Sequence, residues 1–318
     1  MTERKVTEKP SSKEMEIHTL LYSWAERTGL KRVSDRHGLS RRLNDLAISL
    51  LDIAQDVRFS LFQRRFDRSG ASGGISAAIL TVDPSSYLEQ CLESIRKQTL
   101  APSRVEVIRN VTPFSKASQE ALDRIETEYY VQVDEDMVLK PTCFERLYFL
   151  MMDDPACAQS VADLEDPVFG RITGIKMYRT GPVRSIGFHP FQDEKGCERF
   201  MTRELSNKGF ATLRTRSIQG MHHPSYTQLD IFWKFHFIGE QLRYYQQNPR
   251  VLSDYLEILA RRWQRHHDTL AIFGLAGLFS GLQTDAPSLE LDYANRKNSL
   301  LFQKMKDIID NIDDVHPG

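Results

Sequence analysis

The spacing of hydrophobic residues divides the chain into three parts. In the first 70 residues, hydrophobic positions recur every three or four residues, which predicts amphipathic helices. In the middle part, short hydrophobic runs alternate with stretches of helical periodicity, and after residue 250 the helical spacing returns. We therefore expect a helical amino-terminal extension at 1–70, a main domain at 75–250 and a helical carboxyl-terminal extension at 251–318.

The middle part has the rhythm of an α/β domain. Hydrophobic runs at 75–82, 104–110 and 129–133 are separated by segments with a helical hydrophobic face. A short, continuous apolar run bounded by turn residues is typical of a buried parallel strand. Strands alternating with helices predict a mostly parallel sheet flanked by helices, with functional groups at the carboxyl ends of the strands. Residues 171–179 and 183–190 also alternate as strands do.

Composition and charge exclude several classes of protein. Of the 318 residues, 41% are hydrophobic, and 42 lysines and arginines nearly balance 43 aspartates and glutamates. The apolar content argues against a disordered chain, and the lack of excess positive charge argues against a nucleic-acid-binding protein. The four cysteines form no C-x-x-C pair and the polar start lacks a secretion signal. These features predict a cytoplasmic protein with reduced thiols.

The longest apolar run, at 270–282, bears on membrane association. It is shorter than the roughly 20 residues that span a bilayer, so a buried helix is expected there. The basic residues among the amino-terminal helices are explained by a solvent-exposed face. Peripheral contact with a membrane, an anionic partner and a homo-oligomer stay open as alternatives.

The most informative motif is the triplet Asp134-Glu135-Asp136, which directly follows the third hydrophobic run. The two aspartates would project from the functional edge of the sheet toward a common point. Neighbouring carboxylates repel each other unless a cation lies between them. Mg²⁺ and Mn²⁺ prefer oxygen ligands, and Mg²⁺ often takes substrate phosphate oxygens as well. An acidic loop is the alternative, but the position after the third strand favours a divalent metal site.

Five segments of the middle part follow one another as in a known enzyme family. They are ILTVD (79–83), YLEQCLESIRKQT (87–99), VEVIRN (105–110), SKASQEAL (115–122) and YYVQVDEDMVL (129–139). In this combination the chain resembles the GT-A-fold, family 2-like glycosyltransferases. The resemblance implies a GT-A-like, Rossmann-like domain. It also implies transfer of a sugar from a nucleoside-diphosphate sugar to a hydroxyl of a glycan, lipid or protein acceptor, with inversion.

The resemblance also implies roles for individual residues. Asp134 and Asp136 would hold Mn²⁺ or Mg²⁺ on the donor diphosphate. Asp136 would be the direct ligand, and Asp134 would reach the metal, the ribose or a bound water. The other donor-binding positions implied by the resemblance are Thr81, Val82 and Asp83, which match the loop lining the nucleotide pocket, and Lys116, which matches a position near the donor.

Two features of the second half extend the candidate site. Asp230 begins a helical segment and is followed by Gly239, as on the acceptor side of such enzymes. There an acidic residue takes the proton of the acceptor hydroxyl. The alternative is that Asp230 only begins the helix, where a carboxylate complements the helix dipole. His222 and His223 follow a predicted strand and are candidate metal ligands, with a surface or hydrogen-bonded pair as the alternative.

One position departs from the family pattern. An aspartate that contacts the base normally follows the second strand, and Arg109-Asn110 stands there instead. The identity of the nucleotide is therefore not predicted. Two other functions stay open: a nucleotidyltransferase on a similar fold, and a non-catalytic binding or scaffold protein that retains the fold. The loop TVDPSSY after the first strand lacks the glycine-rich, basic character usual in nucleotidyltransferases.

Overall fold

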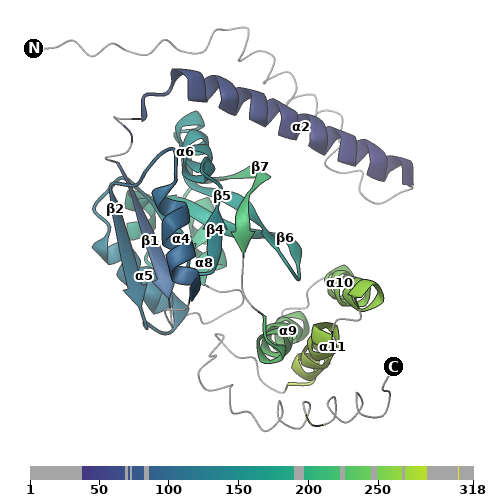
Figure 1. The fold of residues 1–318 in the computed structure, drawn as a ribbon. Helices are drawn as coiled ribbons and strands as arrows, with labels where there is room; N and C mark the ends of the chain where they lie inside the picture. Colours follow the sequence, from purple (N-terminus) through teal and green to yellow (C-terminus); the bar gives the residue numbers. More distant parts are fainter. Residues whose placement is uncertain are drawn as a thin grey trace, which may run out of the picture. The chain divides into compact units, whose positions relative to one another are not determined.

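The chain consists of two compact units, Met1–Asp67 and Arg68–Gly318. The computed structural model describes residues 38–68, 71, 74–81, 86–189, 197–222, 226–244, 249–266, 269–284 and 307. In the first unit the described residues form one long helix, α2 (Gly38–Arg65) (Figure 1), as the spacing of hydrophobic residues predicts. The remainder of the predicted amino-terminal helical region lies outside the described residues.

The second unit is built on a sheet whose described strands follow the order β2-β1-β3-β6-β5-β7-β4 (Figure 1). The strands are β1 (Ile75–Thr81), β2 (Arg104–Arg109), β3 (Tyr129–Asp134), β4 (Met137–Leu139), β5 (Cys157–Asp166), β6 (Gly170–Arg179) and β7 (Ala211–His222). β1 pairs in parallel with β2 and β3, and β5 pairs in parallel with β7. β6 and β4 run antiparallel to their neighbours. The predicted α/β fold with a mostly parallel sheet is thereby confirmed.

Helices connect and cover the strands. They are α4 (Ser86–Arg96), α5 (Phe114–Arg124), α6 (Cys143–Asp153), α7 (Thr180–Arg184) and α8 (Cys197–Asn207). α5, α7 and α8 share one hydrophobic core with even-numbered strand residues such as Ala78, Tyr130 and Tyr178. Odd-numbered strand residues point to the opposite face, and every residue of β1 is buried. Both faces of the central strands are therefore covered, as a parallel sheet requires.

One predicted strand is wrong. Residues 183–190 alternate in hydrophobicity, but the structure forms α7 and a turn there instead. Val183 and Phe188 both enter the core shared with α5 and α8. Gly187 has φ of 76° and donates its N–H to the carbonyl of Val183, which is how a glycine ends a helix. Two buried residues in a short segment are compatible with a helical turn as well as with a strand. The alternation of hydrophobic and polar residues alone could therefore not distinguish the two structures.

The carboxyl-terminal helices form a second hydrophobic core. They are α9 (Gln228–Tyr244), α10 (Pro249–His266) and α11 (Thr269–Leu282). Their core includes Phe232, Phe235 and Phe273, together with Val168 from the turn between β5 and β6. The apolar run at 270–282 is thus a buried helix, as predicted. Among the described helices, none combines the length and hydrophobicity needed to cross a membrane.

Candidate functional site

The carboxyl ends of four strands meet at one edge of the sheet. β1, β3, β5 and β7 all run in the same direction, because β6 is antiparallel to both β3 and β5. They end at Thr81, Asp134, Asp166 and His222. Short β4 follows the acidic triplet and pairs with β7, so that Met137 lies opposite His222. This pairing brings the end of β7 next to the triplet, as the candidate site requires.

A chain of polar contacts runs across this edge from Asp136 to α9. Nε2 of His222 lies 3.2 Å from Oδ2 of Asp136, and Nδ1 of His222 lies 2.6 Å from Oδ2 of Asp166. The same Oδ2 accepts a hydrogen bond of 2.7 Å from the hydroxyl of Tyr226. Nζ of Lys234 donates to the Tyr226 oxygen at 2.5 Å. Five side chains from four separate segments are therefore joined into one network.

The electrostatics of the site follow from burial and close charges. Burial, and then the charges of Asp136 and Glu198, raise the pKa of Asp134 to about 7. Burial would lower the pKa of His222, but hydrogen bonds with Asp136 and Asp166 outweigh it and raise this pKa to about 9. Burial would raise the pKa of Asp166, but its hydrogen bonds to His222, to the Phe169 N–H and to Tyr226 lower it to about 2. Without a bound cation, the ring of His222 is thus the positive partner of Asp136.

The raised pKa of His222 predicts a pH-dependent stability. Because this pKa rises from 6.5 to about 9 on folding, its contribution is complete below pH 6.5 and is lost as the pH rises through 9. Asp134, with a pKa of about 7, is half protonated at the start of this window, and losing the rest of its proton adds a smaller fall of the same sign. Urea unfolding without metal should show a free energy of unfolding roughly 2 kcal/mol lower at about pH 9.5 than at about pH 7. An equally large fall in Asp136→Asn would contradict the assignment.

One oxygen of the triplet is left unsatisfied. In the described part of the structure, Oδ1 of Asp136 is buried and has no hydrogen-bond partner, although its side chain as a whole is 26% exposed. A buried polar atom without a partner costs free energy and needs an explanation. Across the same described residues, no group of three or more His, Cys, Asp or Glu side chains is arranged to hold a metal ion.

The remaining predicted site residues are distributed along and beyond this edge. Thr81 is buried and donates its hydroxyl to the carboxylate of Glu135. Lys116 is exposed in the first turn of α5, beyond the end of β2. Asp230 lies in the first turn of α9. Val82, Asp83 and His223 lie outside the described residues.

Three residues of the network were not predicted from the sequence. Asp166, Tyr226 and Lys234 contact one another or His222 at this edge. Asp166 ends a strand that the sequence analysis did not identify, since β5 reads as a mixed polar and apolar segment. The proline that follows it, Pro167, was the available local signal. Nothing in the local pattern distinguishes Lys234 from an ordinary surface lysine, because only the fold turns it toward the carboxylates.

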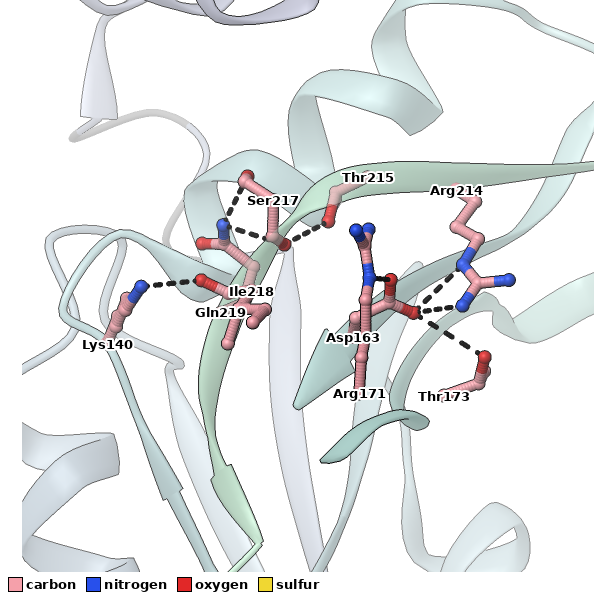
Figure 2. A network of polar contacts seen from close by, with 9 residues as sticks. All are labelled: Lys140, Asp163, Arg171, Thr173, Arg214, Thr215, Ser217, Ile218 and Gln219. Atoms are coloured by element: carbon pink, nitrogen blue, oxygen red, sulfur yellow. Dashed lines mark hydrogen bonds and ion pairs between the residues drawn. The ribbon is translucent and has the colours of Figure 1, made fainter. Parts of the chain in front are cut away.

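A second polar network lies among strands β5, β6 and β7 (Figure 2). The carboxylate of Asp163 on β5 is fully buried. Arg171 and Thr173 of β6 and Arg214 of β7 all point toward it, with Nε of Arg214 at 2.9 Å. A buried carboxylate is tolerated when it is paired and hydrogen-bonded in this way. The network thus ties β5, β6 and β7 together.

The same view shows how β7 is held where its register with β5 shifts (Figure 2). Nε2 of Gln219 donates to the hydroxyl of Ser217 at 2.7 Å. Nζ of Lys140, at the end of β4, donates to the carbonyl of Ile218 at 2.7 Å. The Lys140 contact and the pairing of β4 with β7 hold the last part of β7, which ends at His222, against β4.

The comparisons with known proteins give structural likeness at low identity. No protein-family model and no curated protein sequence matches the chain. Among solved structures, the chain is similar to the mannosyltransferase PcManGT from Pyrobaculum calidifontis in complex with GDP-Man and Mn²⁺. The identity is 9%, over 85% of this chain and 97% of that chain, with a TM-score of 0.44.

Two further solved structures show the same kind of likeness. One is TarS 1–349 from S. aureus, with 12% identity over 66% of this chain and 81% of that chain and a TM-score of 0.36. The other is a CMP:2-keto-3-deoxy-manno-octonic acid synthetase complexed with CTP. There the identity is 12%, over 46% of this chain and 91% of that chain, with a TM-score of 0.34. The candidate site therefore rests on its own geometry.

Proposed function

We propose that the protein is a metal-dependent glycosyltransferase. It would transfer a sugar from a nucleoside-diphosphate sugar to an acceptor hydroxyl. The observation that carries the proposal is the contact of Asp136 with His222, beside Asp134, at the carboxyl-terminal edge of a mostly parallel sheet. Such sheets bind their ligands outside the carboxyl ends of the strands. The family resemblance of the segment from residue 75 to about residue 152 adds the donor class.

The chemistry of the residues fits a divalent cation. Oδ1 of Asp136 is buried without a partner, and burial together with Asp136 raises the pKa of Asp134. A cation would satisfy the first atom and favour the ionised form of the second group. Asp136 and His222 would hold the ion, and Asp134 would reach it directly or through water. The imidazole favours Mn²⁺ over Mg²⁺, whose preferred ligands are all oxygens.

Two protein ligands are enough for this kind of site. Mg²⁺ is usually bound by one or two carboxylates plus substrate phosphates rather than by a cage of protein groups. A site completed by the donor diphosphate does not need a third converging side chain. When bound, a divalent ion would offset the charge that develops on the leaving nucleoside diphosphate.

We assign the general base to Asp230. Asp230 is the third residue of α9, and the N–H and hydroxyl of Thr227 donate to its Oδ2 at 3.0 and 2.6 Å. The N–H of Asp230 donates to the Thr227 hydroxyl in return, at 3.2 Å. This is a capping box, which by itself explains a carboxylate at this position. A carboxylate there could also take the proton of an attacking hydroxyl, with inversion at the anomeric carbon as the expected outcome.

Two substitutions separate the capping and catalytic roles of this carboxylate. Asp230→Asn keeps an oxygen that can accept from Thr227 but removes the base, so turnover should fall about 10²- to 10⁴-fold. Thr227→Ala removes the cap and keeps the carboxylate. It should lower the free energy of unfolding by about 1 kcal/mol and leave turnover nearly unchanged. Initial rates and thermal unfolding measure both effects; an active Asp230→Asn would assign this carboxylate to the cap alone.

A donor hydrolysis screen tests the proposed function. The purified chain is incubated with Mn²⁺ and a panel of uridine, guanosine and cytidine diphosphate sugars, and release of nucleoside diphosphate is measured. We expect slow, Mn²⁺-dependent hydrolysis of at least one donor, because water replaces the absent acceptor. Release of pyrophosphate from a nucleoside triphosphate, without hydrolysis of any sugar donor, would favour a nucleotidyltransferase. No turnover or binding across both panels would favour a binding or scaffold protein.

A further inference from the structure

The hydrogen bonds that link Lys234 of α9 through Tyr226 to Asp166 have a direction fixed by chemistry. An ammonium group has donors and no acceptor. Lys234 must therefore donate to the Tyr226 oxygen, which lies at 2.5 Å. The Tyr226 proton is then directed to Oδ2 of Asp166, at 2.7 Å.

Asp166 is fully occupied as an acceptor. Its Oδ1 accepts from the backbone N–H groups of Val168 and Phe169, both at 2.7 Å. Its Oδ2 accepts from Tyr226 and lies 2.6 Å from Nδ1 of His222. An ionised carboxylate cannot donate, so Nδ1 of His222 must carry the proton in this contact. With its oxygens used in this way and its side chain fully buried, Asp166 is unsuited to bind a metal itself.

We propose that Asp166 is a positioning residue that holds His222 in the tautomer protonated on Nδ1. Tyr226, two residues before α9, fixes Asp166, and Lys234 of α9 fixes Tyr226. The charged ring carries a proton on both nitrogens. In the neutral ring the proton stays on Nδ1, whose 2.6 Å contact with Asp166 is the shorter one, and the lone pair is on Nε2, which lies 3.2 Å from Asp136. A lone pair on Nε2 can bind a divalent cation. The binding of a cation rests on the proposed function, whereas the assignment of the tautomer does not.

Aromatic packing holds the Lys234 side chain in place. Nζ of Lys234 lies 4.8 Å from the ring centroid of Phe169 and 4.7 Å from that of Tyr226. Phe169 stacks on Phe235 of α9, with centroids 5.2 Å apart. Cation–π contacts and aromatic stacking each add to the stability of such an arrangement. The turn after Asp166 and the start of α9 are therefore joined by more than one hydrogen bond.

The substitution Asp166→Asn tests the tautomer directly. With its oxygen toward the N–H groups of Val168 and Phe169, asparagine presents an NH₂ donor to Nδ1 of His222. Nδ1 must then accept, and the proton moves to Nε2, where it blocks a cation. Two-bond ¹H–¹⁵N spectra of metal-free, ¹⁵N-histidine-labelled protein, recorded at a pH at which the ring is neutral, report the tautomer. His222→Gln identifies the signal. We expect an Nδ1–H ring in the wild type and an Nε2–H ring in Asp166→Asn; the same tautomer in both would overturn the proposal.

Mn²⁺ affinity gives the second readout, by electron paramagnetic resonance of the free ion. Asp166→Asn should weaken binding by about 10- to 100-fold, as loss of a group behind a metal-binding histidine typically does. Tyr226→Phe removes a single oxygen and should weaken binding by up to about 10-fold. It serves as the second variant if Asp166→Asn does not fold. Asp123→Asn on α5, an exposed residue that accepts from Gln119, is the matched control and should bind as the wild type does. Wild-type affinity in both site variants would overturn the proposal.

The two hypotheses fail in different ways. A wild type that binds no Mn²⁺ contradicts the proposed metal site, while the tautomer in metal-free protein still decides the role of Asp166. If the wild type binds Mn²⁺ and Asp166→Asn binds it equally well, the metal site is supported and the positioning role of Asp166 is contradicted.

Discussion

Replacing Asp136 by alanine is expected to weaken Mn²⁺ binding by more than about 100-fold. This exceeds the loss of about 10- to 100-fold that is typical for a residue that only hydrogen-bonds to a metal ligand. Asp136 supplies both the unpartnered buried oxygen and the contact with His222. Alanine removes both oxygens, and His222 keeps its contact with Asp166. The free ion is measured by electron paramagnetic resonance during titration, and circular dichroism checks the fold.

The middle residue of the same triplet is the matched control. Glu135 accepts a hydrogen bond from the hydroxyl of Thr81. Glu135→Gln should therefore bind Mn²⁺ within about threefold of the wild type, the size of effect expected for a part-exposed charge. If Asp136→Ala binds as tightly as Glu135→Gln, the triplet is an acidic loop and the metal assignment is wrong.

Gly277→Ala or Gly281→Ala is expected to destabilise the helical core by about 3 kcal/mol, at the upper end for overpacking. A methyl group on Gly277 would lie 2.0 Å from the carbonyl oxygen of Phe232 in α9, and one on Gly281 would lie 1.9 Å from that of His236. These neighbours are backbone atoms, so α9 and α11 must move apart rather than one side chain adjust. Urea unfolding measures the effect.

Gly181 on α7 provides the control for these substitutions. Nothing lies within 4 Å of a methyl group added there, and its φ is not in the left-handed region. Gly181→Ala should be neutral or stabilising by up to about 1 kcal/mol, since alanine restricts the unfolded chain. Equal stability of Gly181→Ala and Gly281→Ala would show that α9 and α11 do not cross closely. Because α9 carries Lys234, loosening this crossing should also weaken Mn²⁺ binding.

The alternation of short apolar runs with segments of helical periodicity was sufficient to predict the first half of the fold. β1 and the first five residues of β3 are buried on both faces and are mostly apolar, so both strands follow from the hydrophobic pattern. The triplet directly follows the apolar residues of β3 in sequence and therefore lies at the end of that strand. The resemblance of residues 75–152 to a known family added the expectation of a donor site, which no spacing rule supplies.

The second half could not be predicted in the same way. β5 carries Gln159, Ser160 and Asp163 in its buried interior, and those polar residues conceal a strand from any rule based on hydrophobicity. Neighbouring strands and helices supply partners for the Gln159 carbonyl oxygen, the Ser160 hydroxyl and the Asp163 carboxylate, which makes such buried polar groups tolerable. The pairing of β4 with β7, which brings His222 to Asp136, joins segments more than 80 residues apart in sequence. Such long-range pairing leaves no local signal.

Asp230 illustrates a different kind of ambiguity. The sequence allows a helix start or a general base, and the structure forms a capping box with Thr227. A cap explains the residue type without excluding chemistry at the same carboxylate. Only a measurement that separates stability from turnover distinguishes the two roles.

Binding of a nucleotide sugar with and without Mn²⁺ tests the central claim most directly. Isothermal titration calorimetry of the full chain is performed with uridine, guanosine and cytidine diphosphate sugars, first with Mn²⁺ and then with excess chelator. The proposed glycosyltransferase should bind at least one donor in Mn²⁺ and lose that binding in chelator and in Asp136→Ala. Absence of binding to every donor in Mn²⁺, or binding that persists unchanged in chelator, would contradict it.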